Sequence, residues 1–391
     1  MKARRSPDLP EGISQSRPSN VAIFGNLGNI GYCCAQFLRK VGIEVNLFVG
    51  RSDLWRLQSF NDSDYPSDYP WITKYQFLSA SLFYQLSVSL RNYDVVQAST
   101  MWSALVYPFA RLHRKPFIAW ATGSDLREMV WSKTVRGRLL KAAFANADCL
   151  LFCDIGLIPF LKQLSPCRSM FIPCPFELGN SLPWHKEHDH RLLVFHFSRL
   201  DYTEKGKPTA YTDGTQGRLS TKGNDVFFKG LALAVASGAQ VQATVVEVGG
   251  DVGAAHHLTK ALGIDHIIKW IPPQNKDGLS QYIEASDVTV DQFELGALGL
   301  VALESMAAGR PCLTWVNPDY IPFTYKEMPP VLNAHSPEEV ARALINLSTR
   351  QAMAREIGNE SRRWIEKYHA PEKITERLLE IYSTPHPYAS D

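Results

Sequence analysis

The chain has 391 residues, of which 45% are apolar, 11% aromatic and 20% charged. This is the composition of a globular protein, with enough chain for two domains of ordinary size. The formal net charge of +2 gives no strong overall field, so no nucleic-acid partner is indicated. No apolar run is long enough to span a membrane, and seven cysteines without a CxxC pair indicate a reducing, cytoplasmic compartment.

Residues 1–18 are polar and lack the apolar core of a signal peptide, so we expect a disordered leader. The first domain is predicted over 19–180. It begins with two apolar runs, 20–24 and 44–49, that have the composition of buried strands. The apolar helical pattern between them, 30–41, completes a βαβ unit.

A glycine-bearing loop over 25–29 forms the first turn of this unit. Turns of this kind bring backbone N–H groups close to a bound phosphate, so Gly28 and Asn29 are candidates for ligand contact. A tight turn without any ligand is the alternative, because a lone glycine loop is a weak signal.

Residues 72–93 are predicted to form a helix, and 94–98 and 116–120 to form strands with a helix between them. Polar residues follow the strand 116–120, at the place where an α/β sheet holds ligands. These candidates for ligand binding are Thr122, Gly123, Ser124 and Asp125. The alternative for Ser124 and Asp125 is a helix N-cap.

A basic amphipathic stretch follows over 133–144, with Lys133, Arg136, Arg138 and Lys141 beside apolar residues. Such a pattern is typical of a solvated helix face. Peripheral contact with the inner face of a membrane is the alternative.

The linker between the domains is predicted over 181–190 and contains His185, His188 and His190. No cysteine or ordered element accompanies these histidines, so we expect a solvated linker and no metal site. The second domain is predicted over 191–368, and a C-terminal helix over 369–391.

The second domain opens with a strand over 192–197, followed directly by Ser198 and Arg199. A long polar segment over 201–221 comes next and contains Lys205; its composition cannot pack a core, so we expect a mobile flap. Lys222 then precedes an apolar helix.

Residues 287–311 read as a strand, a polar glycine-bearing loop and an apolar helix. Such a loop brings free N–H groups and a positive helix end to one point, which suits a phosphate. The candidates in the loop and the first turn of the helix are Asp291, Glu294, Gly296, Gly299, Leu300 and Val301. Glu304 is a carboxylate on an otherwise apolar helix, and it could accept the paired hydroxyls of a ribose.

The motif GLVALESMAAGRP, over 299–311, resembles the nucleotide-sugar-binding segment of retaining GT-B glycosyltransferases of family 4. In that pattern a first glutamate lies eight positions before a second. The second matches Glu304, whereas Gly296 occupies the first position, and Asp291 or Glu294 would replace it. The resemblance is clear over 190–382 and weaker over 20–175.

The resemblance implies an α/β fold of the GT-B type. Two Rossmann-like domains face each other across a cleft, and the C-terminal helix crosses back to the first domain. It also implies that Arg199 and Lys222 hold the donor diphosphate, with Lys205 as the alternative lysine, and that Ile271 lies beside the base. Thr122 occupies the position of a family histidine near donor and acceptor.

The function implied is a retaining hexosyltransferase that needs no cofactor or metal ion. Its donor would be a UDP-sugar, with a GDP-sugar next, and its acceptor a glycan, a lipid-linked sugar or a small molecule. Two alternatives stay open. One is a nucleotide-sugar epimerase or hydrolase of the same fold. The other is a non-catalytic protein that binds sugar nucleotides or glycans, which the departures at Gly296 and Thr122 keep open.

Overall fold

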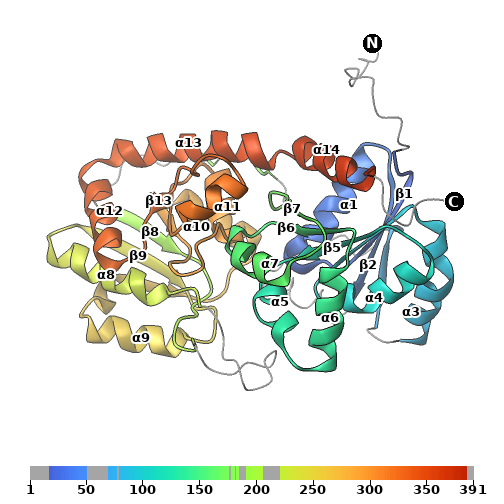
Figure 1. The fold of residues 1–391 in the computed structure, drawn as a ribbon. Coiled ribbons are helices and arrows are strands. Elements are labelled where there is room, and N and C mark those ends of the chain that lie inside the picture. The colour runs from blue at the N-terminus through green and yellow to red at the C-terminus, as the bar shows by residue number, and fades with distance from the viewer. Residues whose placement is uncertain are drawn as a thin grey trace, which may run out of the picture.

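The computed structural model describes residues 17–50, 69–76, 79–175, 178–180, 182–184, 191–205 and 221–384. Most of the predicted leader, most of the linker with its three histidines, and most of the predicted flap lie outside these ranges. Two β-sheets lie side by side, each between layers of helices (Figure 1). No helix in these ranges is both long and apolar enough to cross a membrane.

The first sheet has seven parallel strands in the order β3-β2-β1-β4-β5-β6-β7. Their bounds are β1 Asn20–Phe24, β2 Glu44–Gly50, β3 Ile72–Tyr75, β4 Val95–Ser99, β5 Phe117–Ala121, β6 Cys149–Phe152 and β7 Ser169–Phe171. The main helices around them are α1 Ile30–Lys40, α3 Ala80–Tyr84, α4 Met101–Leu112, α5 Ser124–Arg127, α6 Val135–Ala145 and α7 Ile158–Leu164. The order of strands reverses between β1 and β4, which places a ligand crevice at their carboxyl ends.

The second sheet has six parallel strands in the order β10-β9-β8-β11-β12-β13. These are β8 Leu192–His196, β9 Val241–Val246, β10 Ile268–Ile271, β11 Val288–Val290, β12 Cys312–Thr314 and β13 Leu332–Asn333. The helices are α8 Asn224–Ala236, α9 Val252–Ala261, α10 Lys276–Glu284, α11 Leu300–Ala307, α12 Pro337–Thr349, α13 Gln351–His369 and α14 Pro371–Tyr382. Here the order reverses between β8 and β11, so Ser198 and Asp291 follow two neighbouring strands.

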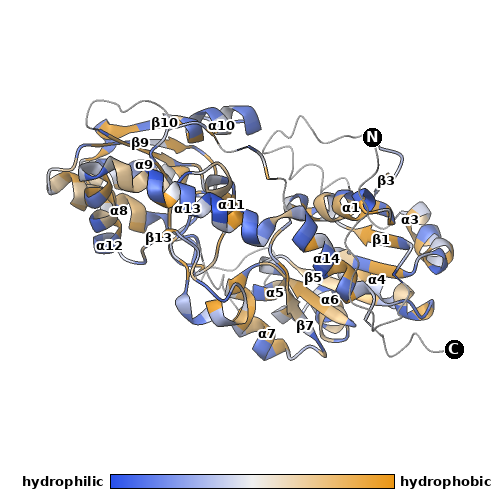
Figure 2. Ribbon diagram, turned by 90° about the horizontal axis from the view of Figure 1, so that it is seen from above, coloured by the Kyte–Doolittle hydropathy of each residue, from blue (hydrophilic) through white to orange (hydrophobic). Residues whose placement is uncertain are grey.

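Both sheets are buried on their two faces, as parallel sheets require. Val21 and Ile23 of β1 belong to one hydrophobic core, and the alternate residues Ala22 and Phe24 belong to another. Figure 2 shows the strands in hydrophobic colours and the outer helices with hydrophilic ones. This burial accounts for the nearly continuous apolar runs in the sequence.

One prediction about the first domain is wrong. Residues 72–75 form the edge strand β3, paired with β2, and not the start of a helix over 72–93. The helical part begins at Ala80 and is interrupted by a π-helical turn over Gln85–Ser89. The β-branched and aromatic residues of Ile72–Tyr75 suit a pleated edge, and tertiary pairing decided their conformation.

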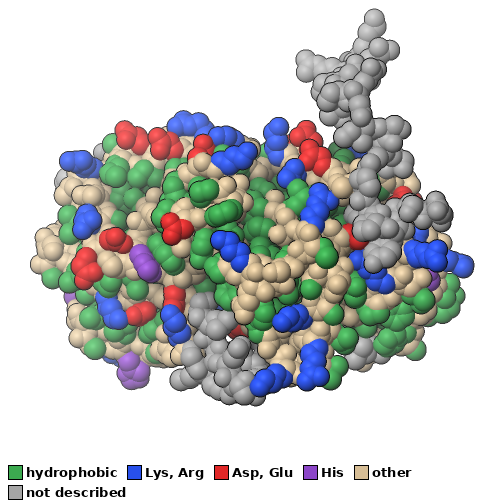
Figure 3. All heavy atoms as spheres, viewed as in Figure 1, with side chains coloured by type: hydrophobic (Ala, Val, Ile, Leu, Met, Phe, Trp, Pro, Cys, Tyr) green, Lys and Arg blue, Asp and Glu red, His purple; other side chains and the backbone are tan. Residues whose placement is uncertain are grey.

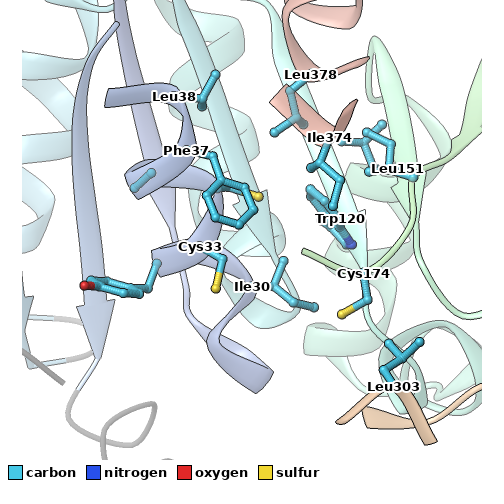
Figure 4. Packing of buried hydrophobic residues seen from close by; sticks show 14 of the residues in the cluster. Ile30, Cys33, Phe37, Leu38, Trp120, Leu151, Cys174, Leu303, Ile374 and Leu378 are labelled. Carbon is cyan, nitrogen blue, oxygen red and sulfur yellow. The ribbon is translucent and has the colours of Figure 1, made fainter. Parts of the chain in front are cut away.

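The chain returns to the first domain at its C-terminal end. In Figure 1, α13 runs along the upper edge of the molecule and α14 lies beside α1. The hydroxyl of Tyr382 in α14 donates a hydrogen bond of 2.5 Å to the buried side chain of Gln97 in β4. Figure 4 shows Ile374 and Leu378 of α14 packed toward Trp120 and Leu151 of the first sheet.

The two domains share one hydrophobic core beneath their contact. Leu303 of α11 packs in the same cluster as Ile30 and Cys33 of α1, and Figure 4 places Leu303 next to Cys174. The loop residue Ala297 belongs to this cluster as well. The helix predicted to bind a phosphate is therefore packed against the first domain on its apolar side.

Arg310 is a fully buried cation that ties the linker to the second domain. Its guanidinium donates to the carbonyl groups of Leu182, Pro183, Glu284 and Ser286, and lies 4.2 Å from the ring centre of Trp184. Burial lowers the pKa of Arg310 to about 10. Arg310, near the end of the motif over 299–311, thus has a structural role. It attaches residues 182–184 to the second domain.

His369 joins the two places where the chain passes between the domains. Its Nδ1 donates to the carbonyl of Cys174 at 3.0 Å, and its Nε2 accepts from the hydroxyl of Tyr325 at 3.1 Å. The ring is fully buried, and this burial lowers the pKa of His369 to about 4. The imidazole is therefore neutral in the folded protein at neutral pH.

We expect the folded state to lose stability as the pH falls from about 6.5 toward 4, because the unfolded histidine binds a proton that the buried one cannot. For His369 the loss should approach about 1.4 kcal/mol per pH unit within that range. The drop in Tm between pH 7 and pH 5 should be smaller for His369→Gln than for the unmodified chain. The control is the same substitution at an exposed histidine, His335→Gln. An equal drop in Tm in all three proteins would contradict the assignment of the pH effect to His369.

Candidate functional site

The carboxyl ends of the two sheets meet at the loop that follows β11. A Cβ atom on Gly28, in the loop after β1, would lie 3.3 Å from Leu300 of α11. A Cβ atom on Gly156, in the short helix Ile155–Leu157, would lie only 2.6 Å from the carbonyl oxygen of Leu295. Predicted candidates from both domains therefore face each other across one cleft.

On the first-domain side, the glycine loop forms a tight turn with left-handed residues and internal hydrogen bonds. Gly28 and Asn29 have left-handed φ angles of 61° and 62°. The buried side chain of Asn26 fixes the loop, since its Oδ1 accepts from the backbone of Tyr32 at 2.7 Å and its Nδ2 donates to Asn29. Sequence reasoning did not single out Asn26, although an asparagine inside a glycine loop is a common turn former.

The cluster after β5 is organised by Asp125, which is buried. Its carboxylate accepts from the backbone of Thr122, Gly123 and Leu126 and from the hydroxyl of Thr122, over 2.8–3.1 Å. Burial raises the pKa of Asp125, although these hydrogen bonds oppose the shift. The N-cap of α5 is Gly123, so the cap expected at Ser124 or Asp125 is wrong. Asp125 holds the turn together, while Ser124 is exposed and Thr122 half-buried.

Arg127 is a second buried charge at this turn that the sequence did not indicate. Its guanidinium forms an ion pair of 2.5 Å with Asp154, whose other oxygen accepts from the backbone of Gly156 at 2.9 Å. The pair braces the turn against the short helix that touches Leu295. The turn after β5 is thus packed, through this short helix, against the loop from the second domain.

On the second-domain side, Lys222 and Asp291 form a buried ion pair. The Nζ of Lys222 lies 3.0 Å from Oδ1 of Asp291 and 2.8 Å from the hydroxyl of Ser198, which itself donates to Asp291 at 2.9 Å. Asp291 is fully buried and the Lys222 side chain is 18% exposed. Asp291 therefore serves as the counter-ion of Lys222 and does not face the cleft as a ligand-binding group.

The other two predicted cations also have carboxylate partners, and here the cation of each pair is open to solvent while its carboxylate is mostly buried. Arg199 lies 3.0 Å from Asp201 with its side chain 56% exposed. Lys205, 58% exposed, is paired with Glu294, which also accepts from the backbone and hydroxyl of Thr221. The exposed ends of Arg199 and Lys205 are therefore accessible to an anion in solution.

The loop after β11 takes its shape from the fully buried amide of Gln292. Its Nε2 donates to the carbonyl groups of Ala297 and Trp315, at 2.6 and 2.8 Å. Its Oε1 accepts from the backbone of Glu294 and Leu295, at 3.1 and 2.7 Å. An Asp-Gln pair at the end of a buried strand was the available sequence signal, but only the structure shows the four partners.

Helix α11 starts directly after this loop. Gly299 is its N-cap residue, Leu300 is 40% exposed, Val301 is half-buried and Glu304 is exposed. Leu300 and Glu304 are four positions apart and share one helix face, and Leu300 contacts Gly28. Glu304 therefore lies on the side of α11 that faces the first domain's glycine loop.

Ile271 does not lie where the resemblance implied. Its side chain is buried in a core with Phe195, Phe197 and Leu279, and its carbonyl accepts from the backbone of Glu247 at 2.8 Å. The β-branched side chain completes the sheet's inner face, so it is not exposed to a nucleotide base. Across the ranges that the structure covers, no three His, Cys, Asp or Glu side chains are placed to hold a metal ion.

Comparison with known proteins identifies the family resemblance and the fold. Residues 213–350 match the family model for group 1 glycosyl transferases. A D-inositol 3-phosphate glycosyltransferase of Rhodococcus opacus is 29% identical over 175 residues, which is 42% of this chain and 39% of that protein. One of Corynebacterium diphtheriae is 32% identical over 102 residues, 24% of each. The chain thus spans about two fifths or less of the length of these curated relatives.

Solved structures match over nearly the whole chain. Sucrose-phosphate synthase of Thermosynechococcus elongatus has a TM-score of 0.62 at 16% identity, covering 93% of this chain and 98% of that one. HepE of Anabaena in complex with UDP-glucose has a TM-score of 0.63 at 13% identity, covering 93% and 99%. WaaG, a lipopolysaccharide glycosyltransferase, has a TM-score of 0.57 at 15% identity, covering 93% and 100%. The predicted resemblance and the GT-B fold are therefore confirmed.

A substitution at Gly299 tests how closely the start of α11 packs against the buried carboxylate of Asp291. A Cβ atom there would lie 2.3 Å from Oδ2 of Asp291. Gly299→Ala must displace either Asp291 or the start of α11, so we expect a loss of about 1–3 kcal/mol in unfolding free energy and weaker nucleotide binding. Thermal unfolding and UDP titration measure both effects.

The matched control is Gly253→Ala in α9, where nothing lies within 4 Å of the added carbon. It should leave binding unchanged and slightly raise the Tm, since alanine favours a helix. If Gly299→Ala behaved like this control, the close packing between Asp291 and α11 would be refuted.

Proposed function

We propose that this protein is a retaining, metal-independent hexosyltransferase that uses a nucleotide diphosphate sugar, a UDP-sugar before a GDP-sugar. Its acceptor is a glycan, a lipid-linked sugar or a small molecule. The observation that carries the proposal is the convergence of Lys222, the start of α11 and the first-domain glycine loop on one cleft. The UDP-glucose complex of the similarly folded HepE supports the choice of nucleotide.

The leaving group of such a reaction is a nucleoside diphosphate, whose negative charge must be stabilised in the transition state. An ammonium group has three donors, and Lys222 uses two of them, on Ser198 and Asp291. The third is left for a phosphate oxygen. Arg199 can exchange Asp201 for a second phosphate oxygen, because its side chain is more than half exposed.

The backbone N–H groups at the start of α11 add the positive end of a helix to the same charge. These groups and the two side chains supply the stabilisation that a divalent cation gives in other transferases. Metal independence follows from this proposal, and activity in the presence of EDTA is its direct measure.

Retention follows if the acceptor attacks on the face from which the diphosphate departs. The diphosphate oxygen then takes the acceptor proton, and no separate base is needed. Thr122, at the position of the family histidine, is compatible with this route. Thr122, Gly123 and Ser124 border the acceptor, and Asp125 keeps their turn in place.

The test that separates the candidate functions is release of UDP from UDP-sugars, with and without acceptors. Transfer with retained configuration supports the proposal, and hydrolysis without any transfer would favour the hydrolase alternative. Binding without turnover would favour a sugar-nucleotide-binding protein, which the unusual Gly296 and Thr122 keep as the second candidate.

We predict that Arg199→Ala and Lys222→Ala each lower kcat by roughly two or more orders of magnitude, as loss of leaving-group stabilisation does. Lys205→Ala should have a mild effect, since its pair with Glu294 lies in solvent. The reverse order for the two lysines would show that Lys205 holds the diphosphate.

Lys222→Ala alone leaves the Asp291 charge buried without its partner, which costs about 3–5 kcal/mol. The control is the double variant Lys222→Met, Asp291→Asn. It removes both charges and should recover most of the Tm without recovering activity. Recovery of activity together with the Tm would mean that Lys222 acts only through folding.

Glu304 should bind the ribose hydroxyls of the donor. We predict that Glu304→Gln weakens UDP binding by about tenfold, corresponding to 1.4 kcal/mol. It should also reduce the preference for UDP over 2′-deoxy-UDP, which tests the diol directly. Glu356→Gln, at an exposed position of α13, is the control. An unchanged preference in the Glu304 variant would exclude the ribose role.

We also propose a peripheral membrane contact through α6. Val135 and Leu139 are 71% and 47% exposed, among the exposed Arg136, Arg138 and Lys141. Figure 3 shows Lys or Arg side chains among hydrophobic ones at the lower edge of the molecule, over α6. Exposed apolar groups flanked by cations suit an anionic membrane surface.

Co-sedimentation with vesicles containing anionic lipid measures this contact. Leu139→Glu should reduce binding severalfold, and high salt should do the same. Leu233→Glu changes a leucine of similar exposure, 43%, on α8 of the second domain, and should bind as the parent does. Equal losses in the two variants would argue against α6 as the contact.

A further inference from the structure

The position where the family pattern has its first glutamate disfavours any side chain in this protein. Gly296 has a φ of 67°, in the left-handed region that favours glycine. A Cβ atom there would lie 3.0 Å from Cζ3 of Trp315 and 3.1 Å from Cβ of Asn317. The space that a carboxylate side chain would enter is thus bounded by the indole ring of Trp315.

Trp315 is held firmly in this place. It follows β12 directly, its backbone N–H donates to the carbonyl of Gln292 at 2.8 Å, and its carbonyl accepts from the Gln292 amide at 2.8 Å. The ring stacks on that of His335, with centres 3.9 Å apart and planes 7° apart. The backbone of Asn317 donates to the carbonyl of Gly296 at 3.1 Å, so loop and ring form one unit.

We propose that Trp315 is a specificity-determining residue that forms a wall of the donor-sugar subsite. The inference rests on the proposed function, because it places the sugar against the loop over 291–299. The half-buried ring offers an apolar surface to the C–H groups of a pyranose. Ligand sites are mostly lined by such apolar and aromatic groups, with a few polar ones that fix orientation.

This placement separates the two halves of the donor. The nucleotide half is held by Lys222, Arg199 and Glu304, whereas Trp315 contacts Gln292, Gly296 and His335. The ring therefore affects affinity for the complete UDP-sugar, while bare UDP does not reach it. A ring that only supports the loop would affect both ligands, since Gln292 and the start of α11 belong to the same loop.

The experiment is calorimetric titration of the full chain without acceptor. The ligands are UDP and whichever of UDP-glucose, UDP-galactose and UDP-N-acetylglucosamine the unmodified protein binds most tightly. Trp315→Leu keeps apolar bulk but removes the aromatic face, and it should weaken UDP-sugar binding about tenfold, with UDP binding within twofold. Trp315→Phe keeps an aromatic face and should retain most of the affinity for the sugar donor.

Gly296→Ala supplies an independent arm, because the added carbon must push the ring away. It should give the same selective loss as Trp315→Leu. Trp270→Leu, in β10 of the same domain, is the control and should leave the ratio of the two affinities unchanged.

Equal losses for UDP and the UDP-sugar in Trp315→Leu would overturn the inference and leave Trp315 a support of the loop. Unchanged binding of both ligands would overturn it as well. Both results leave the proposed function standing, since UDP and its sugar still bind the unmodified protein. Failure of the unmodified protein to bind UDP or any of the three donors would instead refute the proposed function, and the inference with it.

Discussion

The buried pair between Lys222 and Asp291 is the interaction on which the candidate site depends. It joins the end of β11, the turn after β8 and the turn before α8, which meet where the order of strands reverses. Two buried charges are costly to desolvate. The hydroxyl of Ser198 offsets part of this desolvation free energy, because it accepts from Lys222 and donates to Asp291. The pair holds the ammonium group of Lys222 at the carboxyl ends of β8 and β11.

The loop after β11 extends this constraint to the first domain. Gln292 fixes its backbone from inside, and Glu294 holds Lys205 and Thr221 beside it. Its Leu295 carbonyl meets Gly156, which the ion pair of Arg127 and Asp154 braces from the other side. One loop therefore contacts both the Lys222 side of the candidate site and the turn after β5.

The sequence was sufficient for the two-domain fold, because buried parallel strands leave apolar runs of distinct length and glycine loops mark their ends. It failed at Ile72–Tyr75, where pairing with β2 overrode the helical pattern. It singled out Ser198, Lys222 and the start of α11, which the structure brings together around Asp291. It could not tell that Asp291 turns inward or that Ile271 belongs to the core, since both depend on partners far away in the sequence. Arg127 and Trp315 were missed for the same reason, whereas Asn26 bonds to near neighbours and was overlooked.

The same contacts restrict how the two domains can move. Residues 182–184 are attached to the second domain because Arg310 donates to the carbonyl groups of Leu182 and Pro183. Helix α14 is attached to the first domain because Tyr382 donates to Gln97. We therefore expect the flexible points between the domains to lie between these attached segments, near Cys174 in one connection and near Ala370 in the other. Ala370 follows α13 with a non-helical φ of −56° and ψ of 132°. His369 bonds the carbonyl of Cys174 and so ties the two crossings to each other. We therefore expect any rotation between the domains to centre near this bond, as at a hinge.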